Sequence, residues 1–201
     1  MRSMALPAWV PENETKPAPM PLLVVQSFVN TWEADAGTDL LGDPEATARW
    51  LREAGLLGRP VTDEPEIAAA RAVRESIRAL LVHNGGGPAP EPSELEVLRE
   101  LSETCRLMPV VGAPGTVELL PDDGVGMPWI ARLLLIIRDA QGDGTWDRLK
   151  ACRNPDCRWA YYDRSHAGRG AWCDMATCGN RIKNRNLRSR RSAAPSRQPT
   201  A

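Results

Sequence analysis

The clearest pattern of apolar and polar positions lies between residues 64 and 83. Apolar side chains recur there every three or four residues, which is typical of one buried face of an α-helix. Asn84 and three glycines follow, so we expect the helix to end at about residue 83. The charged side chains between the apolar positions are expected mostly to face solvent. The apolar stripe consists of Ile67, Ala70, Val73, Ile77, Leu80 and Leu81, and the charged residues are Arg71, Arg74, Glu75 and Arg78.

Two other segments are rich in apolar residues at helical spacing. One begins at residue 22 and reaches Trp32, although its first four residues are also compatible with a strand. The other covers residues 129–140 and is too apolar for a surface helix, so we expect it to be the central helix of the core.

Capping residues predict two further helices. Asp43 followed by Pro44 is typical of a helix start, and Gly55 is a suitable end. Ser93 with Glu96 three residues later predicts a capping box at the start of a shorter helix.

One β-hairpin is predicted between the helices. Val110 and Val111 precede a turn-rich stretch, and residues 117–120 form a second apolar run.

Charge is distributed unevenly along the chain. The formal net charge is −1, but residues 145–201 hold 13 basic and 4 acidic side chains, whereas residues 1–144 hold 12 basic and 22 acidic ones. This division predicts two parts with different surfaces and different partners.

No segment has the pattern of a membrane span or a signal peptide. The longest apolar run, from Leu133 to Ile137, is far shorter than the ~20 residues needed to cross a bilayer. The N-terminus lacks the continuous apolar stretch of a signal peptide. We therefore expect a soluble, cytoplasmic protein without membrane contact, in which clustered cysteines bind metal rather than form disulfides.

Four of the five cysteines form two C-x4-C pairs separated by fifteen residues. Each pair can turn tightly, and four thiolates complete the tetrahedral environment that zinc prefers. We predict one structural Zn²⁺ per chain, with an iron–sulfur cluster and four ordinary buried thiols as the alternatives. Such a closed site leaves no position for water and disfavours catalysis. The predicted ligands are Cys152, Cys157, Cys173 and Cys178.

Several other residues, some of them next to the cysteine pairs, have predicted roles. Gly179 is expected to adopt a positive φ so that backbone amides point at a thiolate. His166 could replace a thiolate, although four cysteines suffice, and Cys105 is expected to be a core thiol. His83 is expected to interact with the dipole of its helix. The aromatic residues expected to form a small core around the site are Trp159, Tyr161, Tyr162 and Trp172.

The second cysteine pair carries a family resemblance. Cys178-Gly179-Asn180-Arg181, preceded by Trp172-Cys173 and Met175-Ala176-Thr177, closely resembles the bacterial CGNR zinc-finger proteins. In that family a helical ABATE domain precedes the finger and often shows an Asn-Thr pair, a "DLL" triplet and a Trp-Leu helix. The corresponding residues here are Asn30-Thr31, Asp39-Leu40-Leu41 and Trp50-Leu51.

The resemblance covers about residues 20–192 and implies a stress-induced transcription regulator. One departure concerns the loop from Asp163 to Ala171, which lacks some of the basic residues that the family tends to have there. The resemblance therefore does not extend to nucleic-acid contact by this loop.

The last part of the chain is strongly basic. If residues 180–191 are helical, Arg181, Arg185 and Arg188 share one face, and a metal site that fixes the start of such a helix is suited to binding phosphates or a groove. The alternative is a solvated, charged tail that only keeps the protein soluble. The residues predicted to contact DNA, with RNA not excluded, are Arg181, Lys183, Arg185, Arg188, Arg190 and Arg191.

Together these patterns predict a mainly α fold with four parts. They are a flexible arm (1–20), a helical ABATE-like domain with a small β-hairpin (21–145), a CGNR-type zinc finger with a basic helix (146–192) and a disordered tail (193–201). The leading hypothesis is a zinc-binding and nucleic-acid-binding transcription regulator, and a homo-oligomer is compatible with it. The alternative is a zinc-stabilised protein-interaction module without nucleic-acid contact. We expect no enzyme, because no catalytic triad, phosphate loop or open metal site is visible.

Overall fold

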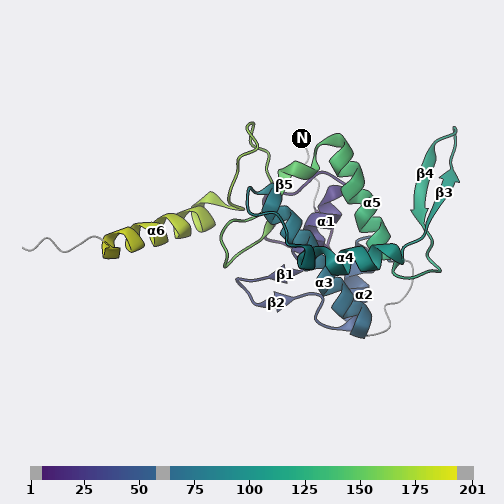
Figure 1. The fold of residues 1–201 in the computed structure, drawn as a ribbon, viewed down its shortest axis with the longest axis horizontal. Helices are drawn as coiled ribbons and strands as arrows, with labels where there is room; N and C mark the ends of the chain where they lie inside the picture. Colours follow the sequence, from purple (N-terminus) through teal and green to yellow (C-terminus); the bar gives the residue numbers. More distant parts are fainter. Residues whose placement is uncertain (1–5, 58–63, 194–201) are drawn as a thin grey trace, which may run out of the picture.

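The computed structural model describes residues 6–57 and 64–193, without the side chains of residues 186 and 189–193 (Figure 1). The described chain is mainly α-helical, as the sequence predicted. Its helices are α1 (Leu22–Val29), α2 (Pro44–Glu53), α3 (Glu64–Asn84), α4 (Pro92–Glu103), α5 (Pro128–Asp143) and α6 (Asn180–Ala193). Its strands form three antiparallel hairpins: β1 (Trp32–Glu33) with β2 (Thr38–Asp39), β3 (Leu107–Val111) with β4 (Val117–Pro121), and β5 (Leu149–Ala151) with β6 (Ala160–Tyr162).

The hydrophobic core is built around α1, α3 and α5. Every residue of α1 is buried, so this helix is as central as α5. The ring of Phe28 in α1 lies between those of Trp50 and Trp129, with centroid distances of 5.7 and 5.9 Å. Aromatic contacts of this kind add to the free energy of burying large apolar surfaces.

The predicted helix ends agree with the structure at α2 and α3. The Asp43 side chain accepts a hydrogen bond from the Ala46 amide at 2.8 Å, and Pro44 occupies the first turn. The prediction for α4 was displaced by two residues. Its capping box consists of Glu91 and Glu94, because Pro92 needs no amide partner in the first turn and moves the start forward.

The prediction that Arg74 and Arg78 of α3 face solvent was wrong, because both are buried. Arg74 makes a bidentate ion pair with Asp39 at 2.6 and 3.1 Å. Arg78 donates to Glu75 and to the backbone carbonyls of Val29 and Arg158. A buried cation is tolerated only where it is paired and hydrogen-bonded, and these partners come from elements that α3 meets only in the fold.

The proline-rich segment before α1 was expected to be a flexible arm. The described part, residues 6–20, has no regular helix or strand but is packed, with Val10, Glu14 and Ala18 buried. The Lys16 carbonyl accepts a hydrogen bond from the Tyr162 amide at 3.0 Å. Extended proline-rich chain can therefore fill a groove between helices and β6, which composition alone does not reveal. The predicted tail at 193–201 lies outside the described residues except for residue 193, the last of α6.

The hairpin β5–β6 joins the cysteine segment to the main core. Leu149, Ala151, Ala160 and Tyr162 belong to the same apolar cluster as the helices. At the end of α3, the side-chain amide of Asn84 donates to the backbone carbonyls of Trp146 and Leu149 at 3.0 and 3.1 Å. The metal-binding segment is therefore attached directly to a hairpin that belongs to the main core.

Within the described ranges, no helix has both the length and the apolar character that crossing a membrane requires.

Candidate metal centre

The fold brings the four predicted cysteine ligands together. Their sulfur atoms all lie within 4.8 Å of one another. The Cys157–Cys173 and Cys173–Cys178 sulfur distances are both 3.7 Å. A tetrahedral zinc site with Zn–S bonds of about 2.3 Å requires sulfur–sulfur distances of about 3.8 Å. The donor set and its dimensions therefore fit one structural zinc.

The first pair of cysteines is positioned by a tight turn after β5. Cys152 is buried, and its amide donates to the Trp159 carbonyl at 2.9 Å. The Asn154 carbonyl accepts from the amides of Cys157 and Arg158, both at 3.0 Å. Arg158 then adopts a φ of 53°, a left-handed conformation that turns the chain back into β6.

Asn154 has a role that the sequence did not reveal. The sequence suggests only that it belongs to a turn, but its side chain is buried and its Nδ2 lies 3.7 Å from the sulfur of Cys178. An amide donor at this distance stabilises a thiolate. Asn154 therefore links the two cysteine pairs.

The second pair is held by a π-helical turn, Met175–Gly179. Asp174, next to Cys173, caps this turn and accepts hydrogen bonds from the Thr177 amide and hydroxyl at 2.7 and 3.0 Å. These bonds lower the pKa of Asp174 below its usual value. The cap fixes the turn that carries Cys178.

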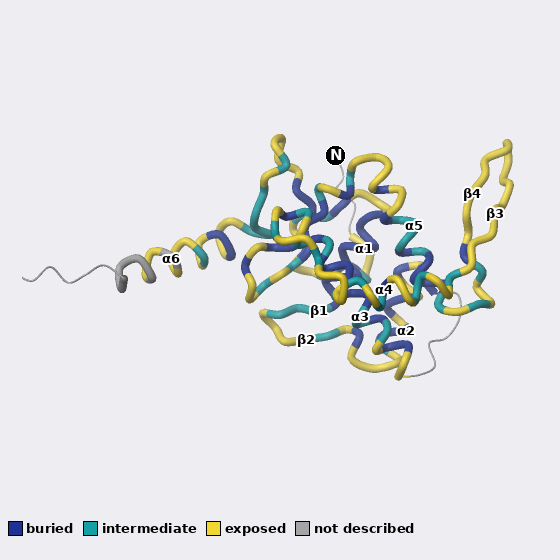
Figure 2. Tube along the Cα trace, in the orientation of Figure 1, coloured by how far each residue is buried: buried dark blue, intermediate teal, exposed yellow. Residues whose placement is uncertain are grey.

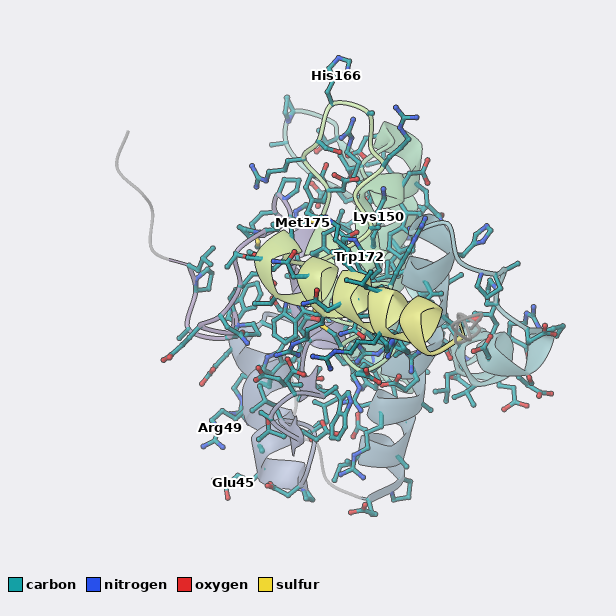
Figure 3. All side chains as sticks on the ribbon, turned by 90° about the vertical axis from the view of Figure 1, so that its left-hand side faces the viewer. Glu45, Arg49, Lys150, His166, Trp172 and Met175 are labelled. Atoms are coloured by element: carbon teal, nitrogen blue, oxygen red, sulfur yellow. The ribbon has the colours of Figure 1, made fainter. Side chains whose placement is uncertain are left out.

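The positive φ predicted for Gly179 was wrong, because Gly179 is not among the described residues with that conformation. A Cβ atom at this position would lie 2.6 Å from the sulfur of Met175 and 3.3 Å from the ring of Trp172. Figure 3 shows Trp172 and Met175 beside the start of α6. Close packing against these side chains, rather than backbone conformation, therefore favours glycine here, since a larger residue would displace the Met175 side chain.

The crowded thiols share negative charge unequally. Hydrogen bonds from Cys157 and Cys173 lower the pKa of Cys152, and the contacts of Cys173 with Cys152 and Cys157 raise the pKa of Cys173. One thiolate is therefore favoured, and a second close to it is opposed by repulsion. A divalent cation such as zinc would balance the charge of four thiolates, and its binding would release protons.

The predicted aromatic core around the site is present in part. Tyr161 is buried against the cysteines, and Trp172 packs on the same cluster. Tyr162 belongs instead to the main core, and Trp159 donates from its indole to Glu14 at 3.2 Å. His166 is exposed at the tip of its loop and does not belong to the cysteine cluster (Figure 3).

A buried ion pair fixes the loop between the two cysteine pairs. Lys150 in β5 lies 2.9 Å from Asp163, and both side chains are 5% exposed. Burial opposes ionisation of Asp163, but hydrogen bonds from Lys150, Ser165 and Gly170 hold its pKa below the usual range. Sequence reasoning missed this pair because Lys150 and Asp163 are thirteen residues apart in segments without helical spacing.

Two of the residues that carried the family resemblance make contacts between separate elements. Asn30, which follows α1, contacts β6, and Asp39 in β2 contacts α3. The Asn30 side chain donates to the Ala160 carbonyl at 2.9 Å and accepts from the Ala160 amide at 2.8 Å. Asp39 is the partner of Arg74 described above. The Asn-Thr and "DLL" motifs thus contribute hydrogen bonds at positions where elements meet.

The basic helix α6 begins two residues after Cys178 and extends away from the rest of the molecule (Figure 1). Arg181 forms an ion pair with Asp35 at 3.1 Å, and Arg185 one with Asp156 at 3.2 Å. Lys183 and Arg188 are exposed. Arg190 and Arg191 lie in the last turns of the helix, where side chains are outside the described part.

The comparison with known families agrees with this architecture. The family model ABATE, described as "Putative stress-induced transcription regulator", matches residues 24–142, and the CGNR zinc finger model matches residues 148–191. These descriptions name a regulator and a zinc finger rather than an enzyme. No curated protein matches the chain. The chain belongs to the ABATE family and carries a CGNR zinc finger, with four cysteines placed for one structural zinc.

Proposed function

We propose that this protein regulates transcription by binding DNA through α6, which the zinc site holds in place. The observation that carries the proposal is the position of α6 directly after the last cysteine. This helix has six basic residues among its fourteen and no acidic one. The proposed contacts are Arg181, Lys183, Arg185, Arg188, Arg190 and Arg191.

The geometry of the helix favours DNA over double-stranded RNA. The major groove of B-DNA admits an α-helix, whereas the major groove of A-form RNA is too narrow for side chains to read. A projecting helix with cations on several sides can contact the phosphates on both edges of such a groove.

The ion pairs of Arg181 and Arg185 do not prevent such contacts. Both arginines and both of their aspartate partners are more than half exposed. Exposed ion pairs contribute little free energy, so phosphates can replace the carboxylates at small cost.

A salt titration of DNA binding tests the proposal. The zinc-loaded chain is mixed with labelled random-sequence duplex DNA, and fluorescence anisotropy is measured over a range of salt concentrations. We expect the affinity to fall steeply with salt, and the double variant Lys183→Gln/Arg188→Gln to reduce the slope by about two phosphate contacts. An RNA duplex serves as the comparison ligand.

The matched control is Arg99→Gln, which removes an exposed cation from α4. It should leave both the affinity and the salt dependence unchanged. The proposal fails if DNA binding is absent at low salt, or if the α6 variant and the α4 variant behave alike.

A further inference from the structure

The hairpin β3–β4 concentrates apolar side chains at the surface. It contributes seven of the twelve large apolar side chains that are exposed among the described residues. Figure 2 shows nearly all of this hairpin as exposed. The seven are Leu107, Met108, Val110, Val111, Val117, Leu119 and Leu120, with exposed fractions from 39% to 72%. Soluble monomers rarely leave so many neighbouring apolar side chains uncovered.

The chemistry of the hairpin indicates an apolar partner. Glu118 is the only charged residue between positions 107 and 121. The hairpin therefore offers no electrostatic complement to a nucleic acid or to a strongly charged protein. An apolar groove of about 580 Å³ lies between the hairpin and α5, lined in part by Met108, Leu120, Leu135 and Ile136.

The two edges of the hairpin differ in their capacity to pair with another strand. Hydrogen bonds from Gly112 to Thr116 and from Asp122 to Arg106 flank the ladder, so Pro109 and Leu119 form a non-hydrogen-bonded pair. At such positions the backbone amide and carbonyl point away from the partner strand. Pro109 has no amide hydrogen and interrupts the outer edge of β3.

The outer edge of β4 has no proline before its last residue, Pro121. Val117 occupies the same kind of position as Leu119, so both residues direct amide and carbonyl groups away from β3. Strand addition through main-chain hydrogen bonds is a recurrent mode of association at edges of this kind.

We propose that a second copy of this chain pairs with β4 through its own β4, forming a four-stranded antiparallel sheet around a two-fold axis. The same apolar and nearly uncharged surface then occurs on both partners, as an isologous contact requires. In this dimer, side chains of the second hairpin fill the groove beside α5.

The exposed area is sufficient for such a contact. If a fully exposed apolar side chain contributes about 150–200 Å², the seven side chains expose on the order of 600 Å² in each copy. The two copies together expose on the order of 1,200 Å² in these side chains; the dimer covers the part beside the β4 edges and the grooves next to α5, which places the contact at the small end of specific interfaces.

The location of the hairpin makes this dimer independent of the proposed DNA contact. The hairpin and α6 lie at opposite ends of the molecule (Figure 1). Dimerisation through β4 leaves both α6 helices uncovered, so the inference can hold or fail whether or not α6 binds DNA.

Sedimentation equilibrium of the zinc-loaded full chain, without nucleic acid, tests the dimer. We expect a mass of twice 22.0 kDa for the natural sequence. Leu119→Pro removes one outward amide from β4 without removing a hydrogen bond within the hairpin, and should weaken the dimer at least about tenfold. The matched control is Val111→Pro, which makes the same change on the edge that Pro109 already interrupts and should leave the dimer intact.

Circular dichroism and zinc content verify that each variant is folded. If Leu119→Pro does not fold, Leu119→Lys places a charge on the same edge and should weaken the dimer to a similar extent. The inference is overturned if the natural chain remains at 22.0 kDa up to about 100 µM. It is equally overturned if the folded Leu119 variants associate as strongly as the natural chain, or if Val111→Pro is as disruptive as they are.

Discussion

The helical region around α1, α3 and α5 and the cysteine segment after β5 are stabilised by different interactions. The helical region has a large apolar cluster that includes Phe28 and Trp129, whereas the separate cluster at the cysteines buries only Cys152, Tyr161 and Cys178. Burial of apolar surface holds the first region together without any ligand. The second depends on metal ligation and on polar contacts such as Lys150–Asp163.

This difference shows how one chain can keep a stable body while making the direction of α6 depend on a metal. The hairpin β5–β6 lies in the main core and should persist without zinc. The π-helical turn and the start of α6 rest on the cysteine cluster and on exposed ion pairs such as Arg181–Asp35, which contribute little free energy, so they should lose their fixed position.

The largest expected effect comes from Cys173→Ser. Loss of one thiolate from a closed site should reduce bound zinc from about one ion per chain to nearly none, because the small cluster at the cysteines buries too little apolar surface to hold the other three ligands in place without the metal. Metal analysis of the purified protein measures this, and far-ultraviolet circular dichroism should retain most of the helical signal.

Cys105→Ser is the matched control, because Cys105 lies against the main core and outside the cluster. It should keep its zinc. A Cys173→Ser protein that retains zinc, or that loses its entire helical signal, would contradict the proposed division between the two regions.

A core substitution should show the opposite pattern. Trp129 is fully buried, and its indole donates to Glu66 at 3.1 Å. Trp129→Ala should lower the free energy of unfolding by about 3–5 kcal/mol, measured by urea denaturation. The folded fraction should still bind one zinc, while Leu187→Ala on the exposed side of α6 should change neither quantity.

The connection between the two regions is tested at Asn30. Asn30→Leu leaves the buried amide of Ala160 without its partner and leaves the Ala160 carbonyl with only the Gln26 side chain as donor, which should cost about 1–3 kcal/mol. We expect a lower midpoint of urea denaturation together with faster release of zinc to a chelator. Asn13→Ala removes an exposed hydrogen bond to Glu33 and should affect neither. Unchanged zinc release in a destabilised Asn30→Leu protein would mean that the regions are not coupled through β6.

The smallest expected effect concerns Asp35. Asp35→Asn removes the exposed partner of Arg181, so stability should change by less than about 1 kcal/mol. DNA affinity should rise about two- to fivefold at low salt, because Arg181 gains freedom and a nearby negative charge is lost. Asp123→Asn makes the same charge change at the exposed ion pair with Arg132, and equal effects of the two variants would show that only net charge matters.

The sequence was most informative where local patterns determine structure. Helical spacing predicted α3 and α5, Asp43 predicted the cap of α2, and paired cysteine spacing predicted the metal centre. These features depend on residues close together in the chain.

The features that sequence reasoning missed depend on contacts between distant segments. Arg78 is buried because the carbonyls of Val29 and Arg158, which are distant in the sequence, accept its hydrogen bonds. Asn154 can donate to a thiolate because the fold brings its side chain next to Cys178. For the same reason, the packing of residues 6–20 and the close contacts around Gly179 are evident only in the fold.

The most direct test of the central claim is the DNA affinity of one preparation measured with zinc, after chelation and after zinc is restored. If the metal centre orients α6 for binding, removal of zinc should weaken affinity at least about tenfold at moderate salt, and added zinc should restore it. The helical circular dichroism signal of the body should change little throughout. An affinity that is the same in all three states would contradict the claim that the zinc site is what makes α6 a DNA-binding helix.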